Sequence, residues 1–180
     1  MGDIKRKFFE ETVPKRVLFI SGKITADMEK ELSHSFIYLN AMNDDPITLY
    51  INSPGGDVLP GLDIYDWVRL SRAPVHGIVV GHAASMASVI LQGCAKRSIA
   101  RHASIMIHTI RIYVELDDLM PENIGNSPSI NDAKKEQEWI YKIFQERTGK
   151  EMSEIHKVFA EKTKFSAEEA KAFCLVDETI

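Results

Sequence analysis

Short apolar segments alternate along this chain with longer segments whose apolar residues recur every three or four positions. The short segments have the length of β-strands, and the longer ones have the spacing that gives a helix one apolar face. These strands lack polar alternation, so we expect a sheet covered on both faces. The pattern predicts an α/β fold with a mostly parallel sheet flanked by helices. The predicted strands are 16–20, 48–51, 75–80 and 104–108, and the predicted helices are 26–40, 59–70 and 85–91.

The pattern changes after residue 108. Residues 109–114 alternate at a period of two, which predicts an exposed or edge strand. Residues 116–129 are acidic and interrupted by proline and glycine, so we expect a loop there. An apolar stripe then predicts a long helix that starts at 131 or 132, ends at 147 and is capped by Gly149. Two short helices, each beginning at a serine cap, complete the predicted elements: 153–160 and 166–173.

Length and composition exclude several classes of protein. The 180 residues suffice for one domain with a buried core, and 44% hydrophobic with 27% charged residues is typical of a globular protein. A net charge of -4 argues against nucleic-acid binding, and no apolar run reaches the length of a membrane span. The polar N-terminus lacks the apolar stretch of a secretion signal, so we expect a cytoplasmic protein. Cys94 and Cys174 match no metal-ligand spacing; we interpret them as core residues and expect no metal or organic cofactor.

A turn of small residues connects one predicted strand to the next predicted helix. Residues 81–84 read Gly-His-Ala-Ala, and Ser85 follows them directly. Small side chains let the backbone turn sharply. A helix that begins there turns its unpaired N–H groups and positive dipole end toward an oxyanion formed at the serine. An α/β protein can place a nucleophile at such a turn, so Ser85 is the candidate nucleophile.

His108 is the candidate base. A serine hydroxyl is a weak nucleophile until a base takes its proton, and histidine is the usual base near neutral pH. His108 ends the predicted strand 104–108, where an open α/β sheet presents its functional residues. If that strand neighbours the one before Ser85, the two side chains come within hydrogen-bond reach. We therefore interpret the pair as catalysts of acyl transfer, and the other five histidines as structural or surface residues.

The pair Gly55-Gly56 follows the predicted strand 48–51. Glycines in that place let backbone N–H groups approach a ligand without a Cβ in the way. One such N–H, from Gly56, could join the N–H of Met86 as an oxyanion hole. The same residues also fit an ordinary turn between a strand and a helix, and the loop alone does not separate the two readings.

Several segments carry a resemblance to a known family. They occur in the family's order and extend over most of the chain: residues 50–56 (Tyr-Ile-Asn-Ser-Pro-Gly-Gly), 64–66 (Ile-Tyr-Asp), 81–86 (Gly-His-Ala-Ala-Ser-Met), 96–97 (Lys-Arg), 105–108 (Ile-Met-Ile-His), 148–149 (Thr-Gly) and 166–170 (Ser-Ala-Glu-Glu-Ala). In this combination the chain resembles the proteolytic subunit of the Clp protease, ClpP.

The resemblance implies a ClpP/crotonase-like fold over a single domain, 1–180. Residues 1–15 are then an N-terminal segment, and 109–148 form a strand, a loop and a protruding helical handle. It further implies a serine endopeptidase that acts on unfolded polypeptides inside a homo-oligomeric chamber of one or two seven-membered rings. An ATP-driven AAA+ unfoldase or a paralogous subunit is the expected partner. By this resemblance Ser85 is the nucleophile, His108 the base, and Gly56 and Met86 the oxyanion donors.

The third member of the catalytic triad departs from the family pattern. The family has an aspartate thirteen residues after the glycine that matches Gly149, and an ungapped count reaches Lys162. A lysine there would disfavour protonation of His108 by charge repulsion. Glu161, the preceding residue, is the candidate replacement, whereas Asp177 matches a different position of the family.

Three other functions stay open at this point. The first is a catalytically impaired ClpP-like subunit with a structural or regulatory role, which Lys162 and the altered segment after His108 favour. The second is a crotonase-type acyl-CoA enzyme, which shares the fold and the two-amide oxyanion hole. The third is an intramolecular or membrane-associated peptidase of the signal-peptide-peptidase type with a serine–lysine pair, in which Lys162 would be the base.

Overall fold

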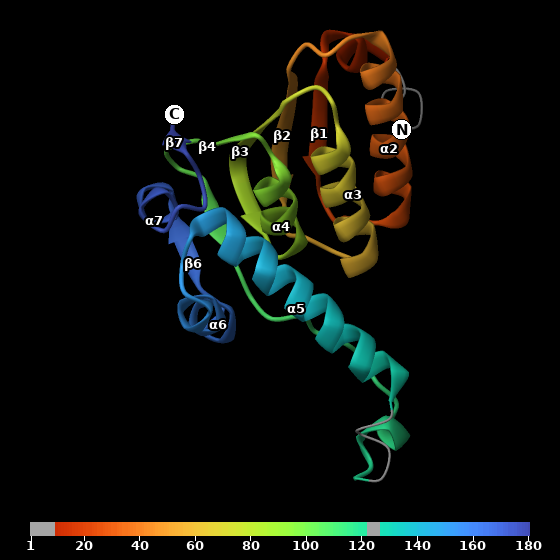
Figure 1. Ribbon diagram of the computed structural model, residues 1–180, viewed down its shortest axis with the longest axis vertical. Coiled ribbons are helices and arrows are strands. Elements are labelled where there is room, and N and C mark those ends of the chain that lie inside the picture. The colour runs from red at the N-terminus through yellow and green to blue at the C-terminus, as the bar shows by residue number, and fades with distance from the viewer. Residues whose placement is uncertain (1–9, 122–126) are drawn as a thin grey trace.

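The computed structural model describes residues 10–121 and 127–180; the predicted features that fall on 1–9 and 122–126 lie outside the described residues. The described strands form one sheet, mostly parallel and flanked by helices, as the sequence predicts (Figure 1). Its main path runs β1 (Val17–Ser21), β2 (Ile47–Ser53), β3 (Val75–Ala84), β4 (Lys96–Ile99) and β7 (Glu178–Thr179), all parallel. Two further strands extend it: β5 (Ser104–Met106), parallel to the end of β3, and β6 (Lys164–Ser166), antiparallel to β5.

The helices alternate with these strands along most of the chain. Those between the first strands, together with the short 3-10 turn before β1, are η1 (Val13–Lys15), α2 (Ala26–Met42), α3 (Val58–Leu70) and α4 (Met86–Gly93). The elements after β5 are η2 (Leu116–Leu119), α5 (Pro128–Thr148), α6 (Met152–Ala160) and α7 (Ala167–Ala172). Figure 1 shows α5 projecting beyond the sheet, toward η2.

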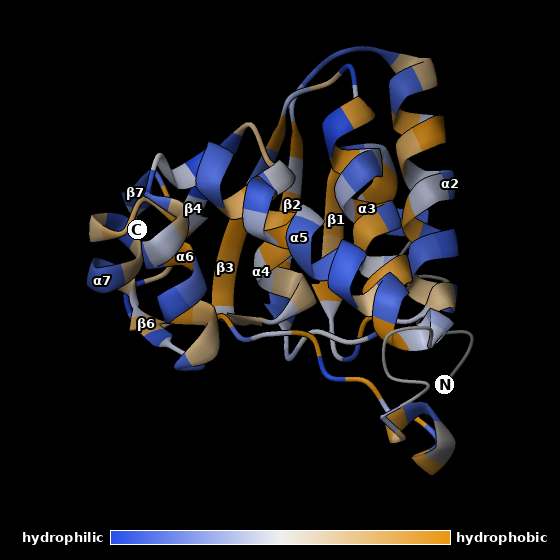
Figure 2. Cartoon of the chain, turned by 60° about the horizontal axis from the view of Figure 1, so that its bottom comes forward, coloured by the Kyte–Doolittle hydropathy of each residue, from blue (hydrophilic) through white to orange (hydrophobic). Residues whose placement is uncertain are grey.

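Only one face of β1 to β3 is fully covered, so the prediction of two covered faces is wrong for these strands. Burial alternates residue by residue along β1 and β2 and along Val75–Val80 of β3. The buried face packs against helices, as at Gly77, where a Cβ would lie 2.7 Å from Cys94 Sγ of the turn after α4. The other face carries Phe19, Tyr50 and Val80, and Val80 is 49% exposed. Because the outer face of β1 and β3 also carries apolar residues such as Phe19 and Val80, hydropathy alone hides the alternation in these two strands, which are largely orange in Figure 2.

Residues 109–114 form no strand, contrary to the period-two prediction. A strand needs a backbone partner, and β5 ends at Met106 with β3 and β6 already on its two sides. The chain follows α5 instead: the Ile110 N–H donates to Gln137 Oε1 at 2.6 Å. The alternation of side chains reflects this contact with a helix rather than pairing in a sheet.

The long helix begins earlier than predicted. Ser127 is its N-cap and accepts a hydrogen bond from the Ile130 N–H, and Pro128 occupies the first helical position. Proline suits that position because its missing N–H would have no partner there. The predicted loop at 116–129 therefore ends at Ser127, and within it η2 forms a 3-10 turn. The predicted cap Gly149 adopts φ 67° and closes the helix as expected.

Smaller differences concern caps, short strands and one cysteine. Ser166 caps α7 in a reciprocal pair with Glu169, as predicted, but α6 is preceded by Glu151 and not capped by Ser153. The sequence prediction misses β4, β6 and β7. Cys94 is buried, whereas Cys174 is exposed, so only the first is the core residue that we expected. No helix in the described ranges is long and apolar enough to cross a membrane.

Candidate active site

Ser85 stands at the point where β3 gives way to α4. Its backbone adopts φ 54° and ψ −126°, a conformation that residues with a side chain rarely adopt. Its N–H donates to the Met106 carbonyl oxygen of β5 at 2.8 Å, and its own carbonyl accepts from the Ser88 N–H at 2.9 Å. The sheet and the helix therefore both hold the turn, which is where the sequence predicts a nucleophile.

The glycine loop after β2 lies directly against this turn. A Cβ on Gly55 would lie 2.6 Å from the Ala84 carbonyl oxygen and 2.7 Å from Ser85 Cβ. Gly55 also has φ +88°, so two independent reasons favour glycine at this position. The loop is fixed from its other side by Ile24, whose N–H donates to the Gly55 carbonyl.

Two backbone N–H groups next to Ser85 are free to bind an anion. Met86 is the first residue of α4, so its N–H has no acceptor within the helix. In the described ranges, neither this N–H nor that of Gly56 donates a hydrogen bond to a backbone or side-chain acceptor. Both residues line the pocket that contains Ser85. This arrangement has the chemistry of an oxyanion hole.

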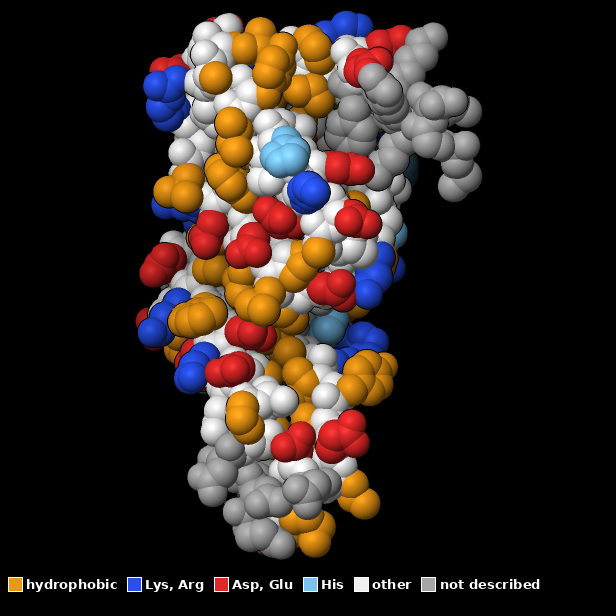
Figure 3. Space-filling model, turned by 90° about the vertical axis from the view of Figure 1, so that its right-hand side faces the viewer, with side chains coloured by type: hydrophobic (Ala, Val, Ile, Leu, Met, Phe, Trp, Pro, Cys, Tyr) orange, Lys and Arg blue, Asp and Glu red, His pale blue; other side chains and the backbone are white. Residues whose placement is uncertain are grey.

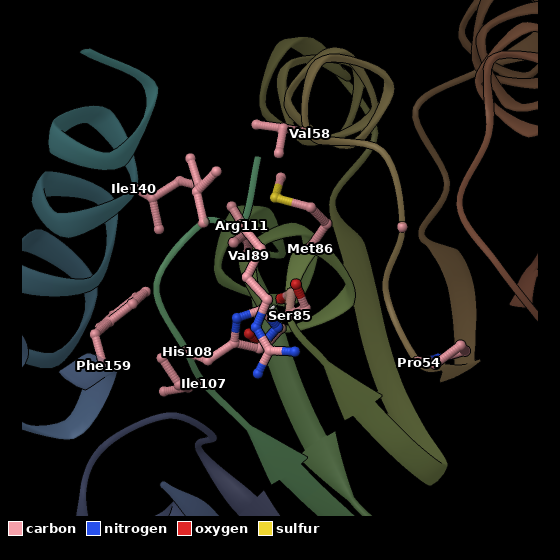
Figure 4. Close-up of a pocket in the computed structure, with 13 residues that line it drawn as sticks. Pro54, Val58, Ser85, Met86, Val89, Ile107, His108, Arg111, Ile140 and Phe159 are labelled. Carbon is pink, nitrogen blue, oxygen red and sulfur yellow. Dashed lines mark hydrogen bonds between the residues drawn. The ribbon is translucent and has the colours of Figure 1, made fainter. Parts of the chain in front are cut away.

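His108 reaches the same pocket from β5. In the sheet, Ala84 pairs with Met106, so the residues that follow each strand emerge side by side at the same edge. Ser85 and His108 both line the pocket, and Figure 4 shows the two side chains at one end of it. The neighbouring strands on which the predicted pairing depends are therefore present. Across the described residues no hydrogen bond joins the Ser85 hydroxyl to His108, and catalytic hydrogen bonds often form only once a substrate is bound.

The imidazole of His108 is oriented by the backbone. Its Nδ1 lies 2.6 Å from the Thr109 carbonyl oxygen. A carbonyl oxygen can only accept a hydrogen bond, so Nδ1 must carry the proton. In the neutral ring Nε2 then keeps its lone pair, which is the state that a general base needs.

The pocket itself has a volume of about 240 Å³ and is lined mainly by apolar side chains. Ile140 of α5 and Phe159 of α6 form one wall, so the C-terminal helices help to enclose the site (Figure 4). The lining residues are Pro54, Gly56, Val58, Ser85, Met86, Ser88, Val89, Ile107, His108, Ile110, Arg111, Ile140 and Phe159.

The candidate third member, Glu161, is not among the lining residues. It ends α6 and is exposed, as is Lys162, which occupies a left-handed turn with φ +53°. The turn does approach the catalytic strand, because the Ile107 N–H donates to the Thr163 carbonyl at 2.9 Å. Position 162 therefore directly precedes the residue that binds the neighbour of His108, but it carries an ammonium group rather than a carboxylate.

Asp177 is engaged elsewhere. Its carboxylate accepts hydrogen bonds from the backbone N–H and the guanidinium group of Arg97. Burial alone would raise the pKa of Asp177, but the hydrogen bonds and the charge of Arg97 outweigh it and hold the pKa below its ordinary value. Asp177 therefore links β4 to the chain before β7.

Two features of the site escaped prediction from the sequence. The Thr109 carbonyl is a backbone group, so no residue pattern indicates its role at His108. Arg111 lies in the segment that we interpreted as a strand, although it lines the pocket. The described residues contain no cluster of three or more His, Cys, Asp or Glu side chains that could hold a metal ion.

Comparison with known proteins gives a consistent result. The family model described as Clp protease matches residues 2–180. Among curated proteins, the ATP-dependent Clp protease proteolytic subunits of Solanum tuberosum and Angiopteris evecta are 32% and 35% identical to this chain. Each alignment covers 97% of this chain and 86% of the relative. That of Epifagus virginiana is 32% identical, over 97% of this chain and 87% of its own length.

Proposed function

The chain belongs to the Clp protease family, and from this we propose that it is a serine endopeptidase with Ser85 as nucleophile and His108 as general base. Its substrates are peptides or unfolded polypeptides. The observation that carries the proposal is that Ser85, His108, Gly56 and Met86, which come from three separate segments, line one pocket.

In the proposed reaction, His108 Nε2 takes the proton of the Ser85 hydroxyl as its oxygen attacks the carbonyl carbon of the substrate. The negative charge that develops on the carbonyl oxygen accepts hydrogen bonds from the Gly56 and Met86 N–H groups, with the dipole of α4 in support. The imidazolium then gives its proton to the leaving amine. Water, activated by the same imidazole, hydrolyses the acyl-enzyme.

We propose that the Thr109 carbonyl takes over one of the two tasks of the missing carboxylate. It fixes the tautomer and orientation of His108 through Nδ1. A neutral carbonyl stabilises an imidazolium less than an ionised carboxylate does, because a hydrogen bond to a charged acceptor is about twice as strong. We therefore expect a working but slow enzyme.

A fluorophosphonate that labels activated serines tests the proposal. We expect it to label the wild-type protein and to leave Ser85→Ala unlabelled. Ser129→Ala is the matched control, because Ser129 is exposed in the first turn of α5 and absent from the pocket lining. Labelling that persists in Ser85→Ala would overturn the assignment of the nucleophile.

One observation favours a second function. Lys162 stands where the family has an aspartate, and neither it nor Glu161 lines the pocket. A subunit without a working triad would act as a structural or regulatory member of a mixed assembly with an active paralogue. A folded, oligomeric sample that no fluorophosphonate labels and that hydrolyses no peptide would support this function over the first.

We further propose that the chain assembles into a heptameric ring, or two stacked rings, that encloses the Ser85 pockets. The names of its relatives describe an ATP-dependent protease. This chain lacks the GxxxxGK[ST] phosphate-binding motif, so any ATP would be hydrolysed by a partner unfoldase. The predicted cytoplasmic location stays a prediction.

A further inference from the structure

We propose that Arg111 makes this site selective for substrates that place a carboxylate beside the scissile bond. This inference rests on the proposed peptidase function and concerns which peptides the Ser85 pocket accepts. The carboxylate is either the side chain of an acidic residue or the free C-terminus of a peptide. Both present the same chemistry to a guanidinium group, and the experiment below separates them.

The charges around the pocket are of one sign. Among its lining residues, Arg111 is the permanent cation, His108 can become one, and no aspartate or glutamate is present. The chain as a whole has a net charge of -4, so this concentration of positive charge is local. The free N–H groups at Gly56 and Met86 add partial positive charge at the same place.

Among the residues that the structure describes, Arg111 has no partner that would neutralise its charge. Arg111 forms no ion pair with another described residue. The ion pairs that the described residues do form involve carboxylates that do not line the pocket. A guanidinium group is always charged at neutral pH and offers two parallel donors that match a carboxylate. An unpaired arginine beside a reactive serine is therefore available to the substrate.

The backbone holds Arg111 close to the reacting groups. Its neighbour Ile110 donates its N–H to Gln137 Oε1 of α5, and two residues earlier His108 is fixed to the Thr109 carbonyl. Figure 4 shows the Arg111 guanidinium group at the same end of the pocket as Ser85 and His108. Because Ser85, His108 and Arg111 line one pocket, we propose that a carboxylate bound to Arg111 lies next to the peptide bond that Ser85 attacks.

The apolar walls of the pocket limit where the carboxylate of a substrate can bind. Ile107, Val89, Ile140 and Phe159 are apolar and would not solvate a carboxylate deeper in the pocket. The pocket therefore suits an apolar side chain in its interior and a carboxylate at the Arg111 side. Because the Arg111 side chain is exposed, we expect the preference to be moderate, about fivefold, as for a well-placed ion pair near a surface.

Three fluorogenic peptides of one core sequence test the proposal. In the first peptide, the residue next to the scissile bond is glutamate and the C-terminus is amidated. In the second, that residue is glutamine and the C-terminus is amidated. In the third, that residue is glutamine and is itself the C-terminal residue, with a free carboxylate. We compare kcat/KM among wild type, Arg111→Gln and Arg101→Gln. Arg101 is the matched control, because it is an exposed arginine in the turn after β4 that does not line the pocket.

We expect wild type and Arg101→Gln to prefer one or both carboxylate peptides about fivefold over the neutral one, and Arg111→Gln to lose the preference. The first peptide reports on acidic side chains and the third on free C-termini. Raising the salt concentration should reduce the preference. Equal rates for all three peptides in wild type, or a preference that survives in Arg111→Gln, would overturn the proposal.

The same peptides, labelled with a fluorophore, separate this inference from the peptidase function. Fluorescence anisotropy measures their binding to Ser85→Ala and to the double variant Ser85→Ala/Arg111→Gln, neither of which needs to be active. A carboxylate preference that depends on Arg111 in binding supports the inference even if the wild-type protein cleaves nothing. Cleavage without any carboxylate preference supports the peptidase and refutes the inference.

Discussion

Ser85 holds a backbone conformation that costs free energy, and its neighbours maintain it. Non-glycine residues with positive φ are uncommon, and such strain is of the order of 1–3 kcal/mol. The Met106 carbonyl fixes its N–H, and Gly55 leaves no space for the turn to relax toward the glycine loop. The gain from this arrangement is that the Ser85 side chain and the first N–H of α4 face the same pocket.

Alanine substitutions at two glycines of similar backbone conformation distinguish the effect of backbone strain from the effect of a steric contact with the Ser85 turn. Gly55 and Gly22 have φ +88° and +82°, but a Cβ would strike the Ser85 turn only from Gly55; at Gly22 it would meet nothing within 4 Å. We expect Gly22→Ala to lose about 1–2 kcal/mol of stability and to keep fluorophosphonate labelling. Gly55→Ala should lose more stability and also lose labelling. Equal labelling of the two folded variants would contradict the proposed contact.

A substitution at position 162 tests whether a carboxylate there would assist His108. In Lys162→Asp a carboxylate replaces the ammonium group on the turn whose Thr163 carbonyl binds the Ile107 N–H, and aspartate tolerates the φ of +53° better than lysine does. We expect kcat/KM for a peptide substrate to rise roughly tenfold or more, because an orienting aspartate is worth up to about 10⁴ in serine proteases. Lys164→Asp, an exposed position on β6 with the same change of charge, is the control and should change little.

An unchanged rate in Lys162→Asp would mean that the turn at 161–163 does not bring a side chain to His108. The limiting geometry would then lie in the segment after His108, where the Thr109 carbonyl already occupies Nδ1. That result would leave the role of Ser85 untouched, because fluorophosphonate labelling tests it separately.

The sequence indicates the candidate side chains Ser85 and His108 and the N–H groups of Gly56 and Met86, but not every backbone group of the site. Ser85 and His108 could be proposed because small residues before a helix and a histidine at the end of a strand are recognisable patterns. The Thr109 carbonyl could not, since every residue has one and only the local fold decides where it points. Arg111 was missed for a related reason: a period-two pattern predicted a strand, although the segment follows α5.

At the level of elements, the short strands at the edge of the sheet are joined by side chains as well as by backbone. The guanidinium group of Arg97 on β4 donates to the Gln92 side chain, to the Cys174 carbonyl and to Asp177. Arg97 is 5% exposed, so its charge needs these acceptors. This cluster fixes β7 and the end of α4 to β4. Neither β4 nor β7 has the apolar pattern of a predicted strand, which explains why they were missed.

Replacement of Asp177 by asparagine tests that cluster. Asp177→Asn leaves the Arg97 guanidinium group without its anionic partner. Allowing for the partial exposure of the carboxylate, we expect a loss of about 1–2 kcal/mol in the free energy of unfolding at pH 7. Asp44→Asn is the control, because the Asp44–Arg72 pair is exposed on both sides and should contribute little.

The contribution of Asp177 to the free energy of unfolding also depends on pH, in a direction set by its lowered pKa. The pKa of Asp177 is lower in the folded chain than its ordinary value near 4, so its contribution is complete above that value and is lost as the pH falls through the lowered one. Urea unfolding of wild type between pH 7 and pH 3 should therefore show a decrease that is smaller in Asp177→Asn. Parallel curves for the two proteins would rule out this linkage.

At the scale of the whole molecule, the chain leaves apolar surface uncovered. We define the α2–α3 patch as Ile37, Tyr38, Met42 and Leu70; each is about half exposed or more, and Ile37 and Leu70 line one groove. Figure 3 shows apolar side chains gathered among charged ones on the side of the molecule that α2 and α3 occupy. Large apolar patches of this kind mark surfaces that bind other proteins. The ring assembly proposed above would cover such a surface.

Leu70, which is 76% exposed, tests whether this patch joins neighbouring chains. A charge buried in an interface is costly, so we expect Leu70→Glu to shift the particle in sedimentation velocity from a heptamer or larger toward single chains. Leu116→Glu is the control: Leu116 is 78% exposed, but lies in η2 at the protruding end of the molecule (Figure 1). It should leave the ring intact and alter at most the stacking of two rings. Circular dichroism would establish that both variants fold. A folded Leu70→Glu that keeps the wild-type sedimentation coefficient would place the contact between chains elsewhere on the surface.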